Sequence, residues 1–186
     1  HGIREISTKL IAAGADYLGV ANYDEAIKLR TLIPDAKILV FGTLIHSKLK
    51  PAAYVKRLLK NDLIATVASL ETARFLDYYS KRLGKKFKVH IKVDTGMKRI
   101  GFDVKMAFKN ISQVFTYKNL DIEGIYTHFA TSESDKTFTI LQLYKFQELL
   151  HNLKKAGMQF PLVHAANSGA VLDLKESYFD MVRPGL

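Results

Sequence analysis

Cysteine is absent from the 186-residue sequence, and so is any long apolar run. Without thiols the chain can form neither disulfide bonds nor thiolate metal sites, which fits the reducing cytoplasm. A membrane-spanning helix needs about 18 to 20 consecutive apolar residues, and no segment of the sequence has them. We therefore expect a cytoplasmic protein that holds no metal and does not cross a membrane.

Acidic residues are in the minority, because 18 aspartates and glutamates face 28 lysines and arginines and give a formal net charge of +10. Such a charge favours nucleic acid, an anionic membrane surface or small anions as ligands. The basic residues are scattered along the expected helices, and no platform of basic and aromatic residues for nucleic acid stands out. We expect small anionic ligands, and neither a nucleic acid nor a membrane as partner.

An initial methionine and a recognisable signal peptide are also missing, since the chain opens at His1. We expect the sequence to be a piece of a longer protein. Its 186 residues and its hydrophobic content of 48% are typical of one globular domain.

A short apolar strand, a small loop and an amphipathic helix follow one another repeatedly along the chain. Strands that alternate with helices indicate parallel pairing. From Asp16 onward the pattern gives one strand fewer than a closed eight-stranded barrel, so we predict an α/β protein with a (β/α)8 TIM-type barrel whose first strand precedes His1. The rival is an open doubly wound sheet, but no Gly-x-Gly-x-x-Gly turn follows any strand.

The boundaries of these elements come from apolar periodicity and from capping residues. The expected strands are residues 16–20, 38–41, 63–67, the segment through Lys92, 122–128, 162–165 and 179–182. The expected helices are residues 3–13, a helix capped by Asn22 or Asp24 that closes before Pro34, 51–59, 69–83, 104–117, 135–156 and a short helix from Ser168.

The segment 89–94 has apolar residues at alternate positions, with His90, Lys92 and Asp94 between them. One face of this strand is therefore apolar and the other carries chemistry. A lysine that points into a protein is costly unless something pairs with it or modifies it. Lys92 is thus an early indication of a functional site.

Polar side chains stand at the ends of four consecutive expected strands. In a (β/α)8 barrel the active site lies where strands end and the following loops begin. We therefore expect these side chains to converge on one site. They are Lys92, Asp94, Arg99, His128, the segment 164–168 and Arg183.

The last two strand ends occupy the usual phosphate site of such barrels. Ser168 offers a hydroxyl at a helix start, where N–H groups and the helix dipole favour an anion. Gly185 allows a phosphate to approach backbone amides closely. Each residue alone also fits a plain role, Ser168 as a helix cap and Gly185 as a turn, but together they favour phosphate.

Four motifs in the same order resemble the alanine racemase family over the whole chain. They are residues 92–101, 127–130, 164–168 and 183–186. The resemblance implies an enzyme that uses pyridoxal phosphate (PLP), with an N-terminal (β/α)8 barrel that holds the cofactor. It also implies a homodimer in which a C-terminal β domain of the partner subunit completes each active site. Residues 1–186 would then be most of the barrel domain, and the β domain would lie outside this sequence.

The resemblance assigns cofactor contacts to several residues. Arg183 matches an arginine that donates to the pyridine nitrogen of PLP, and His128 and His164 resemble the residues that hold this arginine. Because a guanidinium does not give up its proton, the ring nitrogen would stay unprotonated, which suppresses transamination. Ser168, Gly185 and Leu186 resemble the phosphate contacts, and Asn167 either shapes that loop or is a plain turn residue.

Two further residues match the substrate side of the family's site. Arg99 matches an arginine that contacts the substrate carboxylate. The alternative is that Arg99 is an exposed loop residue without a functional role. Lys92 matches a lysine that is often carbamylated, and the carbamate would turn a buried cation into an anion that orients Arg99. Asp94 and Thr95 are expected only to shape the loop, and His90 is assigned no role.

The implied reaction interconverts L- and D-alanine by two-base proton transfer and supplies D-alanine for peptidoglycan. The family's Schiff-base lysine would precede His1, and the opposing tyrosine would come from the partner subunit, so residues 1–186 alone should be inactive. Three alternatives stay open: a related serine or lysine racemase, a PLP decarboxylase of the same fold, and a non-catalytic PLP-binding barrel protein. The decarboxylase is disfavoured because such enzymes pair the pyridine nitrogen with a carboxylate, where this chain has Arg183.

Overall fold

The computed structural model describes residues 2–43 and 51–185. Within these ranges the chain forms one parallel sheet in the order β1-β2-β3-β4-β6-β7, with β5 paired to β4. The strands are β1 (Tyr17–Val20), β2 (Lys37–Val40), β3 (Leu63–Val67), β4 (Phe87–Asp94), β5 (Phe102–Asp103), β6 (Leu120–Tyr126) and β7 (Leu162–His164).

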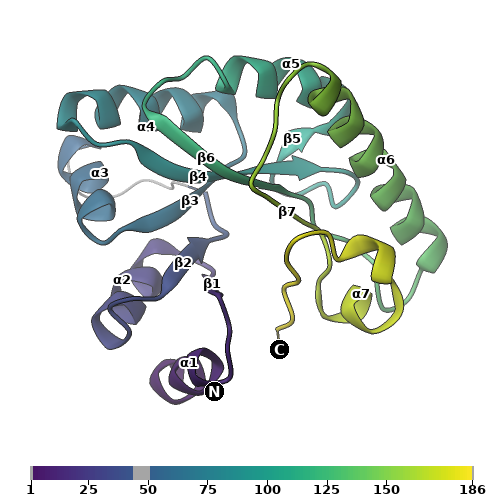
Figure 1. The fold of residues 1–186 in the computed structure, drawn as a ribbon, viewed down its shortest axis with the longest axis horizontal. Coiled ribbons are helices and arrows are strands. Elements are labelled where there is room, and N and C mark those ends of the chain that lie inside the picture. The colour runs from purple at the N-terminus through teal and green to yellow at the C-terminus, as the bar shows by residue number, and fades with distance from the viewer. Residues whose placement is uncertain (1, 44–50, 186) are drawn as a thin grey trace.

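Helices connect these strands and lie on the outer side of the curved sheet (Figure 1). They are α1 (Ile3–Ala12), α2 (Tyr23–Leu32), α3 (Pro51–Lys60), α4 (Leu70–Leu83), α5 (Val104–Val114), α6 (Lys136–Lys155) and α7 (Ser168–Asp173), followed by a 3-10 turn at Lys175–Ser177. Parallel strands joined by outer helices, in an order that follows the chain, form most of the wall of a (β/α)8 barrel. The predicted fold class is therefore confirmed, and the doubly wound sheet is excluded because the strand order never reverses.

Local sequence signals explain where the helices begin and end. The Asn22 side chain accepts a hydrogen bond from the Glu25 backbone N–H at 2.9 Å, so Asn22 and not Asp24 caps α2. Ser69 caps α4 in the same way through the N–H of Thr72 at 3.2 Å. Gly84 ends α4 in the left-handed conformation, with φ 67°, which glycine adopts without steric cost.

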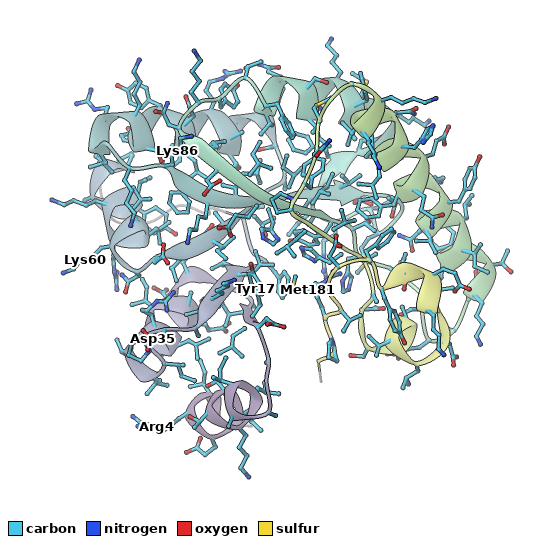
Figure 2. All side chains as sticks on the ribbon, in the orientation of Figure 1. Arg4, Tyr17, Asp35, Lys60, Lys86 and Met181 are labelled. Carbon is cyan, nitrogen blue, oxygen red and sulfur yellow. The ribbon has the colours of Figure 1, made fainter. Side chains whose placement is uncertain are left out.

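The core lies between the sheet and its helices. The apolar residues of β4 that the alternation predicted, Val89, Ile91 and Val93, are fully buried in it. Charged residues such as Arg4, Asp35, Lys60 and Lys86 are exposed on the outside (Figure 2). No helix in the described part of the chain is both long enough and apolar enough to span a membrane.

One expected strand is absent from the described residues, and one short strand was not predicted. Residues 179–182 do not form a strand, because only Met181 pairs, in a single parallel bridge with His164. Phe179 has φ 47°, which turns the backbone out of an extended path just before that bridge. The short strand β5 was not predicted, because two residues are too few to show a period.

Candidate active site

The polar residues singled out in the sequence gather at the carboxyl ends of neighbouring strands. In the sheet Lys92 pairs with Tyr126, Tyr126 pairs with His164, and His164 bridges to Met181. Arg183 follows that bridge, and its backbone N–H donates to the Ala166 carbonyl at 2.9 Å. Residues from four separate parts of the sequence therefore meet at one edge of the sheet, as a barrel active site requires.

Arg183 is held by three hydrogen bonds. Its Nη1 lies 2.7 Å from Nδ1 of His164, and its Nη2 donates to the carbonyls of Thr127 at 2.8 Å and Ala165 at 2.9 Å. Burial lowers the pKa of Arg183 to about 10, which still leaves the guanidinium charged at neutral pH. A guanidinium has five N–H donors. Two of these, on Nε and Nη1, make no hydrogen bond within residues 2–43 and 51–185 and remain for a ligand.

The two histidines expected beside Arg183 are placed differently. His164 contacts the guanidinium directly, whereas the backbone carbonyl of Thr127, and not the His128 side chain, takes the second position. Burial, with the charges of Arg183, Lys92 and Arg99, lowers the pKa of His128 to about 4. The His128 imidazole is therefore neutral at pH 7 and lies within the electrostatic reach of three cations.

Tyr126 lies at the centre of the site, although the sequence analysis did not select it. Its ring stacks on His164 with centroids 4.7 Å apart, and Arg183 and Lys92 approach the ring centre to 5.2 and 5.6 Å. Its hydroxyl pairs with Thr66 on β3 at 2.8 Å. The ring thus lies within cation–π distance of both cations. Strand alternation places Tyr126 two residues before His128 on the inward face, and this signal was available in the sequence.

Lys92 is only 4% exposed and lacks an acidic partner among the ion pairs of the described residues. Burial, followed by the charges of Arg99 and Arg183, lowers the pKa of its amine to about 8. Lys88, on the same face of β4, contrasts with it because its amine lies 3.5 Å from Asp62 and 3.9 Å from Glu123. Lys92 is thus a buried lysine near other cations, and its amine loses a proton more easily than an ordinary lysine does.

The loop after β4 is folded around the carboxylate of Asp94. This carboxylate accepts backbone N–H groups from Gly96 at 2.9 Å, Lys98 at 3.0 Å and Arg99 at 2.9 Å. Burial alone would raise the pKa of Asp94, but the backbone hydrogen bonds outweigh it and lower the pKa below the usual value. Asp94 therefore shapes the loop, as the sequence indicated, and the exposed Arg99 side chain is carried on it.

The expected phosphate residues lie together at the last turn. The Ser168 hydroxyl donates to the Gly185 carbonyl at 2.7 Å and accepts the Gly185 N–H at 2.9 Å. Asn167, and not Ser168, caps α7, since its side chain accepts from the N–H of Ala170 at 3.4 Å. A Cβ built at Gly185 would meet no atom within 4 Å, so packing does not require glycine at this position. Leu186 lies outside the described residues.

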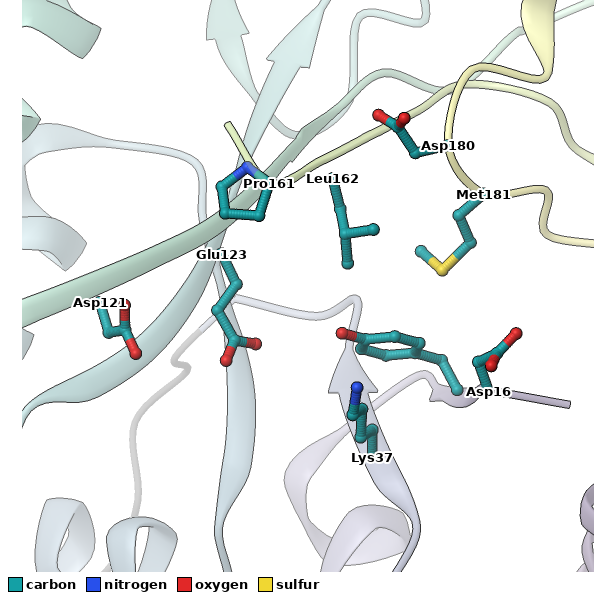
Figure 3. A pocket seen from close by; sticks show the side chains of 9 residues that line it. Asp16, Lys37, Asp121, Glu123, Pro161, Leu162, Asp180 and Met181 are labelled. Carbon is teal, nitrogen blue, oxygen red and sulfur yellow. The ribbon is translucent and has the colours of Figure 1, made fainter. Parts of the chain in front are cut away.

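A pocket of about 620 Å³ lies at the opposite end of the strands (Figure 3). Tyr17, Lys37 and Leu162 line it, and each is the first residue of its strand. Enzymes of this fold use the carboxyl ends of the strands, whereas the amino ends serve stability. The pocket is therefore separate from the candidate active site.

Comparison with known proteins agrees with this arrangement. A family described as "Alanine racemase, N-terminal domain" matches residues 1–186. The alanine racemase of Methanococcus maripaludis is 42% identical over 188 residues, which are 100% of this chain and 49% of that protein. That of Carboxydothermus hydrogenoformans is 41% identical and is likewise covered to 49%. The chain thus spans about half the length of the curated relatives that it matches.

Solved structures show the same likeness. An alanine racemase of Clostridium difficile 630 in complex with cycloserine has a TM-score of 0.90 at 34% identity, and the match covers 100% of this chain and 50% of that one. An alanine racemase of Bacillus anthracis with bound L-Ala-P has a TM-score of 0.85 at 33% identity, with 47% of that chain covered.

Proposed function

This chain belongs to the family of alanine racemase N-terminal domains, and we propose that it forms most of the cofactor-binding barrel of an enzyme that interconverts L- and D-alanine. The observation that carries this proposal is Arg183. Three hydrogen bonds hold it in place, and two of its N–H groups have no partner in the described part of the chain and can donate to a ligand. Family membership over residues 1–186 supports the same reaction.

The residues at this site fit PLP. Arg183 would hold an acceptor nitrogen of the pyridine ring. Ser168 and the Gly185 amide would hold the phosphate by exchanging the hydrogen bonds that they now make with each other for bonds to phosphate oxygens. Bound PLP supplies an electron sink that makes the α-proton of an amino acid removable. Because Arg183 donates hydrogen bonds without losing its proton, it keeps the atom it contacts unprotonated and limits how far that sink draws electrons. Proton exchange is thereby favoured over transamination.

Lys92 and Arg99 would form the substrate side. A lysine whose pKa is lowered to about 8 has an appreciable neutral fraction at physiological pH, and the neutral amine is the form that adds carbon dioxide. The amine nitrogen would bond to carbon and release a proton, which would leave a carbamate anion in place of the buried cation. That anion would attract Arg99 and Arg183, whose charges now add to burial in lowering the Lys92 pKa, and it would orient Arg99 towards a substrate carboxylate.

The two catalytic bases of the proposed reaction would lie outside residues 1–186. The lysine that binds the cofactor covalently would precede His1, and the opposing tyrosine would come from a C-terminal β domain of the partner subunit in a homodimer. Residues 1–186 alone would then lack racemase activity. We also propose a cytoplasmic location and a supply of D-alanine to peptidoglycan, both of which the family membership supports.

The test uses the full-length protein with L-alanine in deuterated water. We expect D-alanine to form with deuterium at the α-carbon of both enantiomers, because the two bases exchange their protons with solvent. A decarboxylated product, or faster turnover of serine or lysine, would instead favour one of the alternative enzymes. Binding of PLP without turnover of any amino acid would favour the non-catalytic barrel.

A further inference from the structure

A line of three side chains runs from the candidate active site into the interior of the sheet. Nη1 of Arg183 lies 2.7 Å from Nδ1 of His164, and Nε2 of His164 lies 2.8 Å from Nδ1 of His90. His90 and His164 are both fully buried. His90 is therefore linked to Arg183 through one imidazole.

The chemistry of Arg183 fixes the direction of every hydrogen bond in this line. A guanidinium only donates, so Nδ1 of His164 must be a bare acceptor. A neutral imidazole carries a single N–H, which in His164 must then be on Nε2. That N–H donates to Nδ1 of His90, so His90 in turn carries its proton on Nε2. The two contacts of His164 therefore favour the same tautomer, because Arg183 needs a bare Nδ1 and Nδ1 of His90 accepts the N–H on Nε2.

The fold makes room for this contact. Gly124 on β6 pairs with His90, and an added Cβ there would lie 2.8 Å from both Cε1 and Nδ1 of His90. A larger residue at position 124 would collide with the atom of His90 that contacts His164, so the imidazole could not keep its present position. Nε2 of His90 is buried and has no hydrogen-bond partner among the described residues. The ring is therefore oriented so that Nδ1 contacts His164 while Nε2 stays unsatisfied, which costs free energy.

We propose that His90 is a positioning residue for Arg183. It accepts the N–H of His164, locks His164 in the tautomer that can accept from Arg183, and so keeps the guanidinium aimed at the ligand acceptor. Without that acceptor, the imidazole of His164 is free to carry its proton on Nδ1, where it would oppose the N–H of Arg183. The protonation of His164 on Nε2 does not depend on the proposed function, whereas the effect of His90 on cofactor binding rests on it.

The test compares His90→Asn with His90→Leu in the full-length protein. Asparagine and leucine have nearly the same shape, but only asparagine places an acceptor oxygen near the position of Nδ1. His151→Leu on the exposed face of α6 is the matched control. Nitrogen-15 NMR of labelled histidines in the cofactor-free protein reports which nitrogen of His164 is protonated, and titration with PLP gives its Kd.

We expect the wild type, His90→Asn and His151→Leu to show His164 protonated on Nε2. We expect His90→Leu to lose this signature and to bind PLP about tenfold more weakly, the effect of one misdirected hydrogen bond. Gly124→Ala should reproduce the change in His164 by displacing the imidazole of His90, and it serves as a second route if His90→Leu fails to fold.

Three results would overturn the proposal: Nδ1 protonation of His164 in the wild type, an unchanged His164 in His90→Leu, or equal losses in the leucine and asparagine variants. The wild-type spectrum decides the tautomer even if every variant misfolds. If the wild type shows the expected tautomer but does not bind PLP, the proposed function fails while the hydrogen-bond order survives.

Discussion

Replacing Gly101 with alanine should destabilise the loop that carries Arg99 and the strand on which it rests. Gly101 has φ +140°, and an added Cβ would lie 2.6 Å from the backbone nitrogen of Asp94 and 2.8 Å from the carbonyl carbon of Val93. Both atoms belong to β4, which is paired with three other strands and cannot shift to make room.

Two separate costs give the magnitude. The backbone conformation alone costs an L-residue about 1 to 3 kcal/mol. Overlap with packed backbone atoms adds about 1 to 3 kcal/mol. Gly14→Ala is the matched control, because Gly14 has φ +94° but a Cβ there would meet no atom within 4 Å. It should show the conformational cost alone.

Urea unfolding of the cofactor-free full-length protein, followed by circular dichroism, measures both variants. We expect Gly101→Ala to lose about 1 to 3 kcal/mol more unfolding free energy than Gly14→Ala. Equal losses would show that β4 and its loop yield to the methyl group, and the argument that Gly101 positions Arg99 through a rigid turn would be refuted.

Three other predictions concern the core of the site. Arg183→Glu should abolish most racemisation and raise transamination, because a carboxylic acid can protonate the pyridine nitrogen that Arg183 leaves unprotonated. Arg74→Glu on the exposed side of α4 is the control. An unchanged ratio of racemisation to transamination products in Arg183→Glu would contradict the reasoning. Burial, then the charge of Arg183, lowers the His90 pKa from 6.5 to about 4. Between these pH values the unfolded chain binds a proton at His90 and the folded chain does not. The unfolding free energy should therefore fall by about 2 to 3 kcal/mol as the pH drops from 6.5 towards 4. Urea titrations at several pH values would show this slope, and it should be shallower in His90→Leu. Tyr126→Phe removes the hydroxyl bonded to Thr66 and should cost about 1 kcal/mol in the same assay, whereas a loss near zero would mean that water replaces the bond.

The alternation of strands and helices was predictable because each element carries its own periodicity and caps. Asn22, Ser69 and Gly84 are local signals, and local signals suffice to place α2 and α4. The end of the chain was harder, since a single bridge at Met181 depends on a partner strand and on the turned backbone of Phe179. Pairing with a distant strand leaves no period in the sequence around it.

The site was predictable as a set of residues but not as a set of contacts. Motif spacing selected Arg183, His164 and Lys92, and the structure brings them around one tyrosine ring. Two of the three acceptors of Arg183 are backbone carbonyls, which exist at every position and leave no mark in a sequence. His90 was passed over for the same reason, because its partner is 74 residues away.

The strand order also bears on how the protein is made. Along the sheet β1, β2, β3, β4, β6 and β7 lie in the order of synthesis, so each strand that leaves the ribosome finds the edge of its partner already present. Long-range pairing slows folding because distant segments must first meet. A wall that grows by one neighbouring unit at a time avoids most of that search. Within this sheet, the bridge between His164 and Met181, which precedes Arg183, comes after all the paired strands in the order of synthesis.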